Sequence, residues 1–134
     1  MSPTDGLKLG IKPGSIVQEF GDGIDSDMDL ITSIKESKEW TYVEEHFQDV
    51  VDVVLLWWRE NDGDLVDALV DAMTNLADHG VIWLLTPKPG REGHVEAEDI
   101  ADSAPTSGLQ VTSSITAAKN WQGTRLVAPK VTRG

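Results

Sequence analysis

The chain contains no cysteine among its 134 residues, and acidic residues outnumber basic ones about two to one. Without cysteine it forms neither a disulfide scaffold nor a thiolate metal site, and a cysteine nucleophile is excluded. The longest apolar run, Val53–Trp58, is far shorter than the roughly 20 residues that span a bilayer. Apolar residues near the start are isolated, so we expect no signal peptide, no membrane partner and a cytoplasmic location.

Charge is unevenly distributed along the chain. The formal net charge is −12, and residues 1–80 hold 18 acidic and 5 basic residues, whereas residues 81–134 hold 5 and 6. Because so acidic a protein repels phosphate backbones, we expect no nucleic-acid partner. The acidic surface either keeps the protein soluble or meets a basic protein surface, and the composition leaves both alternatives open.

Hydrophobic periodicity predicts strands that alternate with helices. Ser26 and Asp64 are placed to cap two of the helices, and Gly80 to end the second. Two of the strands are almost continuously apolar, which is typical of strands covered on both faces. The expected strands are 15–20, 40–43, 50–57, 81–86, 109–115 and 124–128, and the expected helices are 26–38, 64–80 and 96–104.

This order predicts a three-layer α/β domain with a largely parallel sheet of about six strands. Only a loop, 116–123, separates the last two strands, so we expect them to pair antiparallel at an edge of the sheet. The domain should occupy residues 7–128, after a flexible lead-in at 1–6 and before a polar tail at 129–134. An exposed strand at 124–128 would permit a homodimer, and a monomer is the alternative.

Several separate segments carry a family likeness. The run Asp49–Trp58, the helix after it and the segment Gly80–Lys88 resemble a family of small actinobacterial proteins of unknown function. The opening Leu9–Gly14 and the late Trp121–Val127 fit the same family. The resemblance extends over about residues 7–128 and implies no particular chemistry.

The strand–helix–strand part also looks like the second half of a class I methyltransferase-like Rossmann domain. The resemblance implies a reduced form of that fold, and fold alone does not determine chemistry. Methyltransferase-like folds bind S-adenosylmethionine at a Gly-x-Gly-x-Gly turn after the first strand, with an acid before it. Here Asp25 replaces the third glycine, so a plain strand-to-helix turn is the alternative. The resemblance implies these cofactor-binding candidates: Glu19, Gly21, Gly23 and, for a ribose at the end of the second strand, Glu44 or Glu45.

The carboxyl-terminal edge of the sheet, here called the rim, is where ligands bind in open parallel sheets. Four expected loops reach it, and they gather more than a third of the basic residues on an otherwise acidic chain. Bases with aromatics suit an anionic or planar ligand, or a protein partner. The alternative is that the tryptophans fill the core and the bases are solvated. The rim candidates are Trp58, Arg59, Lys88, Arg91, His94, Trp121 and Arg125.

Metal binding finds little support in the sequence. Asp25, Asp27, Asp29 and Glu36 match four positions of a calcium loop, but Leu30 stands where such a loop requires glycine. The three histidines lie far apart, and His79 is expected in the last turn of a helix. We assign no metal.

The sequence contains no evident acid–base pair or nucleophile. It therefore favours a non-catalytic cytoplasmic interaction or regulatory protein that binds a protein partner through the rim, with no assigned cofactor. The alternative is a small binder of S-adenosylmethionine or a nucleotide-like ligand, with methyltransferase activity left open. A third hypothesis is an adaptor whose acidic face binds a basic protein.

Overall fold

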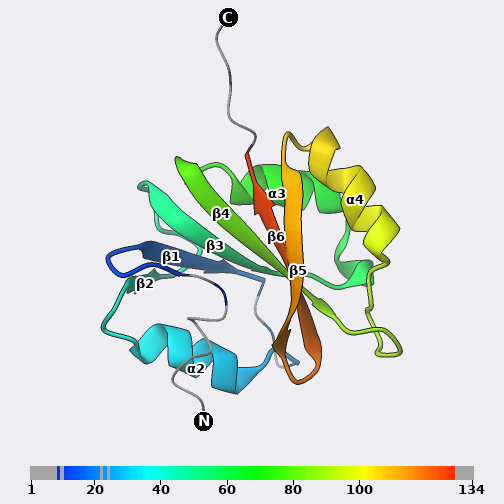
Figure 1. The fold of residues 1–134 in the computed structure, drawn as a ribbon, viewed down its shortest axis with the longest axis horizontal. Coiled ribbons are helices and arrows are strands. Elements are labelled where there is room, and N and C mark those ends of the chain that lie inside the picture. Colours follow the sequence, from blue (N-terminus) through cyan, green and yellow to red (C-terminus); the bar gives the residue numbers. More distant parts are fainter. Residues whose placement is uncertain (1–8, 10, 22, 24, 129–134) are drawn as a thin grey trace, which may run out of the picture.

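A computed structural model describes residues 9, 11–21, 23 and 25–128 of the chain. The predicted lead-in at 1–6 and tail at 129–134 lie outside these residues. Between β3 and α3 lies a short 3-10 helix, Glu60–Asp62. The other elements are β1 Ile16–Phe20, α2 Met28–Glu36, β2 Thr41–Val43, β3 Val51–Trp57, α3 Leu65–Ala72, β4 Leu76–Pro87, α4 Ala97–Thr106, β5 Gln110–Ala118 and β6 Trp121–Val127 (Figure 1).

The described strands form one six-stranded sheet in the order β2-β1-β3-β4-β6-β5. The first four strands are parallel to one another, whereas β6 runs antiparallel to both of its neighbours, β4 and β5. The predicted α/β class, the largely parallel sheet and the antiparallel pairing of the last two strands are confirmed. β5, rather than β6, is the edge strand, so the edge expected at 124–128 is wrong.

The sheet is covered on both faces. Of the described helices, α2 lies on one face and α3 and α4 lie on the other (Figure 1). Along β3, Val53, Leu55 and Trp57 pack on the α2 face, and Val54 and Leu56 pack on the α3 face. This alternation explains the continuously apolar run, because both sides of the strand are buried.

The boundaries of several helices and strands differ from the predictions, because strand pairing prevails over the helical spacing of apolar residues. The second helix ends at Ala72, and Leu76 already pairs with Val51 of β3, so His79 lies on a strand. Gly80 does not end a helix; a Cβ at Gly80 would collide with the Leu76 side chain. The predicted loop 116–123 belongs largely to the β5–β6 hairpin, because pairing with β4 extends β6 back to Trp121.

The helix caps are partly as predicted. Asp64 caps α3 by accepting hydrogen bonds from the amides of Val66 and Asp67. At α2 the cap is Asp27 rather than Ser26, whose hydroxyl accepts a hydrogen bond from the Gly23 amide instead. No helix in the described part of the chain is long and apolar enough to cross a membrane.

Candidate functional site at the carboxyl-terminal edge of the sheet

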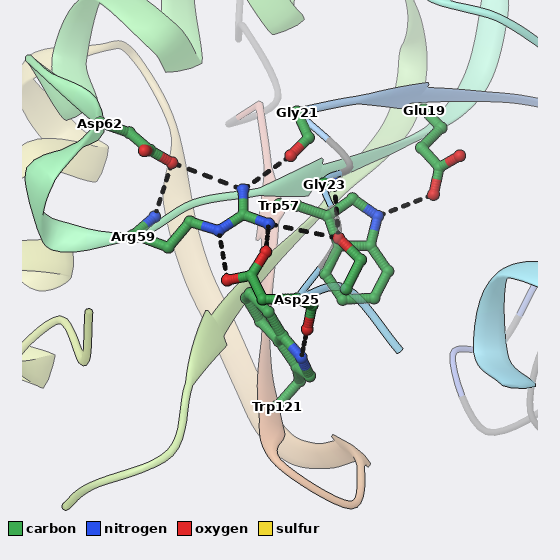
Figure 2. Close-up of polar contacts among 9 residues, drawn as sticks. Glu19, Gly21, Gly23, Asp25, Trp57, Arg59, Asp62 and Trp121 are labelled. Atoms are coloured by element: carbon green, nitrogen blue, oxygen red, sulfur yellow. Dashed lines mark hydrogen bonds and ion pairs between the residues drawn. The ribbon is translucent and has the colours of Figure 1, made fainter. Parts of the chain in front are cut away.

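Three parallel strands end side by side at the rim. β1 ends at Phe20, β3 at Trp57 and β4 at Pro87, and the antiparallel β6 begins there because Trp121 pairs with Pro87. The glycine turn that follows β1 and the residues that follow β3 therefore lie close together (Figure 2). This is the place where open α/β sheets bind their ligands.

Arg59, just after β3, fills the space beside the glycine turn (Figure 2). Its Nε and Nη2 atoms donate to the two carboxylate oxygens of Asp25 at 3.0 and 2.5 Å. Its Nη1 donates to the Gly21 carbonyl at 2.6 Å and lies 3.5 Å from Asp62, and Nη2 also lies 3.2 Å from the Ser26 hydroxyl. A guanidinium has five N–H donors, and these five contacts use them all.

The ion pair between Arg59 and Asp25 also sets the charge state of the carboxyl group. The side-chain hydrogen bond from Arg59 is the main cause that holds the pKa of Asp25 below its usual value. At neutral pH the pair is therefore fully ionised.

Trp121 supports this pair from the β6 side. The Arg59 guanidinium lies 5.1 Å from the centre of the Trp121 ring, and the indole N–H donates to the Asp25 carbonyl at 3.2 Å. Trp121 also meets Trp57 edge to face, with ring centres 4.8 Å apart. Because Trp121 is 3% exposed, its ring is a packing element of the rim.

The acid and the glycines of the predicted cofactor turn contact the protein itself. Glu19 is 3% exposed and accepts hydrogen bonds from Tyr42 at 2.5 Å and from the Trp57 indole at 2.7 Å. Gly21 has φ +76°, and a Cβ there would lie 2.5 Å from the Trp57 carbonyl oxygen. A Cβ on Gly23 would lie 3.3 Å from Arg59 Nη2. Asp22, between the glycines, lies outside the described residues.

Glu44 and Glu45 follow β2 and are exposed. The Glu44 carboxylate accepts a hydrogen bond from the His46 amide at 2.7 Å. The backbone carbonyls of both glutamates accept hydrogen bonds from Gln18 Nε2. Glu44 therefore stabilises a local turn, and its carboxylate forms no hydrogen bond with the described residues of the glycine turn.

A cavity of about 440 Å³, here called the crevice cavity, remains at the rim. Three of the predicted rim residues line it. Of these, Arg91 is exposed and forms no ion pair with any described residue, so its guanidinium is available. The crevice cavity is lined by Asp25, Arg59, Asn61, Pro87, Arg91, Glu92, Gly93 and Trp121.

The remaining rim candidates separate in space. Lys88 begins the loop after β4, where its amide donates to the Asn120 carbonyl. Trp58 is 8% exposed and packs in the core on the α3 face. His94 Nδ1 lies 2.8 Å from the Pro87 carbonyl, and its ring lines a neighbouring cavity.

Arg125 is not at the rim, which corrects the prediction. β6 starts at the rim and runs antiparallel to β4, so its later residues lie progressively farther from the rim. Arg125 therefore pairs with Trp83 in the middle of β4. Its guanidinium donates to the Thr112 hydroxyl at 3.0 Å. It lines a cavity of about 250 Å³ near the opposite ends of the strands, with Lys12 and Asp52.

The contact between Arg59 and Asp25 was missed from the sequence. The two residues are 34 positions apart, and no spacing rule joins them. The one available signal was the acid in place of the third glycine, because a carboxylate attracts a cation. Within the described residues, no three histidine or acidic side chains are grouped to hold a metal ion.

Comparison with solved structures relates the fold to methyltransferases. A putative type 11 methyltransferase from Sulfolobus solfataricus is similar with a TM-score of 0.58 and 16% identity, covering 96% of this chain and 90% of that one. An S-adenosylmethionine-dependent methyltransferase from Aquifex aeolicus is similar with a TM-score of 0.61 and 14% identity, covering 93% and 88%. Identity this low establishes the methyltransferase-like fold alone, as expected from the sequence.

Comparison of sequences identifies the family. Uncharacterized proteins of Mycobacterium tuberculosis and Mycobacterium bovis are each 49% identical over 127 residues, which covers 95% of this chain and 80% of theirs. Residues 6–130 match the model of a family described as protein of unknown function, DUF3052. The resemblance seen in the sequence is confirmed, and the chain belongs to this family of unknown function, which is built here on a methyltransferase-like fold.

Proposed function

We propose that the protein is a cytoplasmic, non-catalytic binding protein with a regulatory role, which uses the rim of a methyltransferase-like sheet to hold an acidic protein partner. The observation that carries this proposal is the position of Arg59. Its guanidinium fills the space beside the glycine turn, and all five of its donors are engaged by the protein.

A cofactor at this turn would have to displace groups that already satisfy one another. Asp25 and Arg59 form a two-point ion pair, which is among the stronger polar contacts in proteins. Glu19, the acid that would hold a cofactor in the methyltransferase-like pattern, is buried with both oxygens engaged. Removing Arg59 from the turn would leave Asp25 without its cation, so the arrangement opposes cofactor binding.

The loop Pro87–His94 supports an interaction role. Lys88 and Arg91 form no ion pairs with the described residues, although the chain as a whole carries a net charge of −12. With Glu92 as the one acid of this loop, the two bases give it a net charge of +1, which attracts an acidic segment of a partner. Arginine is also enriched at the centres of protein interfaces.

The competing function is binding of S-adenosylmethionine or a nucleotide-like ligand, with or without methyl transfer. It is supported by the glycines after β1 on this fold. Isothermal titration calorimetry of the full chain with S-adenosylmethionine and with S-adenosylhomocysteine separates the two. We expect no heat of binding up to millimolar ligand, and saturable binding of either compound would refute the non-catalytic proposal.

The interaction itself is tested by affinity capture from an actinobacterial extract with three baits. They are the wild type, Lys88→Ala/Arg91→Ala, and a control with the same charge change at the end of α2 and just after it, Lys35→Ala/Lys38→Ala. We expect one protein to be retained by the wild type and the control and lost with the rim variant. Retention of every captured protein by all three baits would remove the rim from the proposal.

A further inference from the structure

A second cavity, here called the α4 cavity, lies on the opposite face of the sheet from α2. It has a volume of about 420 Å³, which is within the range of small-molecule sites. It is lined by residues of α4, of the loop after β4 and of the β5–β6 hairpin. Its lining comprises Thr86, Pro89, His94, Val95, Glu96, Ala97, Ile100, Ala101, Val111, Ser114, Gln122 and Thr124.

Two threonine hydroxyls open onto this cavity without partners among the described residues. Thr86 is 2% exposed and Thr124 is 6% exposed, and they lie on the paired strands β4 and β6. Neither hydroxyl forms a hydrogen bond with any residue that the structure describes. By contrast, the Ser26 hydroxyl accepts from the Gly23 amide, and the Ser107 hydroxyl donates to the Ser103 carbonyl at 2.8 Å. Because the two threonine hydroxyls are accessible from the cavity and make no hydrogen bond within the described part of the protein, both can bond to a polar group of a ligand there.

Further polar atoms face the same space. His94 Nδ1 lies 2.8 Å from the Pro87 carbonyl, which makes Nδ1 a protonated nitrogen, and Nε2 lies 3.9 Å from the Glu96 carboxylate. Ser114 accepts a hydrogen bond from Gln122 Nε2 at 2.8 Å, so its own proton is free to be donated. The cavity can therefore both donate hydrogen bonds to a ligand and accept them.

The charge of the lining restricts the ligand. Glu96 is its one acidic residue, and that side chain is 75% exposed. The walls are apolar, from Val95, Ile100 and Val111. We propose that the α4 cavity binds an uncharged, mainly apolar small molecule, aromatic or alicyclic, whose hydroxyl, carbonyl or amide group bonds to Thr86 and Thr124. This inference does not depend on the function proposed for the rim.

Phenol and benzamide are suitable probes, and benzoate is the charged comparison. Titration of the labelled full chain, followed by amide NMR spectra, should move the signals of Thr86, Val95, Ile100 and Thr124 at millimolar phenol or benzamide. Benzoate should bind these residues at least tenfold more weakly, because the lining contains no lysine or arginine to compensate its charge. The absence of shifts at these residues, or equal binding of benzoate, would overturn the proposal.

Two variants make the test specific. Ala101→Phe places a ring in the cavity from an exposed position of α4, and Asp102→Phe adds the same ring at the next, non-lining position. We expect Ala101→Phe to weaken phenol binding more than tenfold and Asp102→Phe to leave it unchanged. Thr124→Val removes one hydroxyl and should weaken phenol about fivefold. Unchanged binding in both Ala101→Phe and Thr124→Val would contradict the assigned site.

Discussion

The crevice cavity and the α4 cavity are similar in volume, about 440 and 420 Å³, yet Arg59 beside the first and two threonines in the second differ in their hydrogen bonding. Beside the glycine turn, every donor of Arg59 is engaged by the protein itself. Under α4, the hydroxyls of Thr86 and Thr124 open onto the cavity and have no partner among the described residues. Hydrogen bonding therefore distinguishes the glycine turn, where the protein satisfies its own polar groups, from the α4 cavity, where hydroxyls are open to a ligand, and volume does not.

The largest expected effect tests how tightly the glycine turn packs on β3. Gly21→Ala should destabilise the protein by about 2–4 kcal/mol, because its Cβ would lie 2.5 Å from the Trp57 carbonyl and φ is positive. Gly90→Ala is the control: its φ is +87°, but a Cβ there meets nothing within 4 Å, so about 1 kcal/mol is expected. Urea unfolding measures both, and equal losses would show that the close approach is unimportant.

The next effect concerns the ion pair between Arg59 and Asp25 beside the glycine turn. Arg59→Ala should cost about 2 kcal/mol, because it removes hydrogen bonds from four residues and the contact with the Trp121 ring. A double-mutant cycle with Asp25→Ala should give a coupling of about 1 kcal/mol. Additive losses would mean that the pair contributes nothing measurable, as happens for many exposed pairs.

A smaller effect depends on pH. Arg59 lowers the pKa of Asp25 in the folded state, so the contribution of this carboxylate is present above the unfolded pKa of about 3.9 and is lost as the pH falls through the folded pKa. The difference in melting temperature between the wild type and Asp25→Asn should be constant from pH 5 to 8 and should shrink below about pH 4. A difference that persists unchanged at the lowest pH would assign the stabilisation to something other than the ionised carboxylate.

The smallest effect compares one hydroxyl from each region. Ser26→Ala removes a hydroxyl that accepts from Gly23 and Arg59, and it should cost about 1 kcal/mol. Thr124→Val removes a hydroxyl without a described partner and should change the stability by less than about 0.5 kcal/mol or raise it. Thermal unfolding at one pH suffices for both. A larger loss for Thr124→Val than for Ser26→Ala would show that the hydroxyl under α4 is already satisfied.

Much of the fold could be predicted from local patterns, and the errors have a common cause. The apolar runs of β3 and β4 indicated strands buried on both faces, and Asp64 indicated the start of α3. The helix expected to continue to Gly80 ends at Ala72, because pairing with β3 extends β4 back to Leu76. A local sequence pattern carries no information about the hydrogen bonds that a residue can form with a strand distant in the sequence.

The candidate site was less predictable than the fold. The rim was expected from topology, and Arg59, Arg91 and Trp121 do line one cavity there. Arg125 was misplaced, because the direction and register of β6 decide which of its residues reach the rim. The role of the two threonines in the α4 cavity could not be predicted, because the sequence of a strand does not show whether a hydroxyl forms a hydrogen bond in the folded protein.

By itself, the sequence determined the α/β class, the largely parallel sheet and the family, because apolar runs, caps and family segments are local properties of the chain. Only the tertiary structure decided that Arg59 reaches Asp25 across 34 residues and that Thr86 and Thr124 share a cavity. These contacts depend on strand order and register, which are set by backbone pairing and burial over the whole sheet.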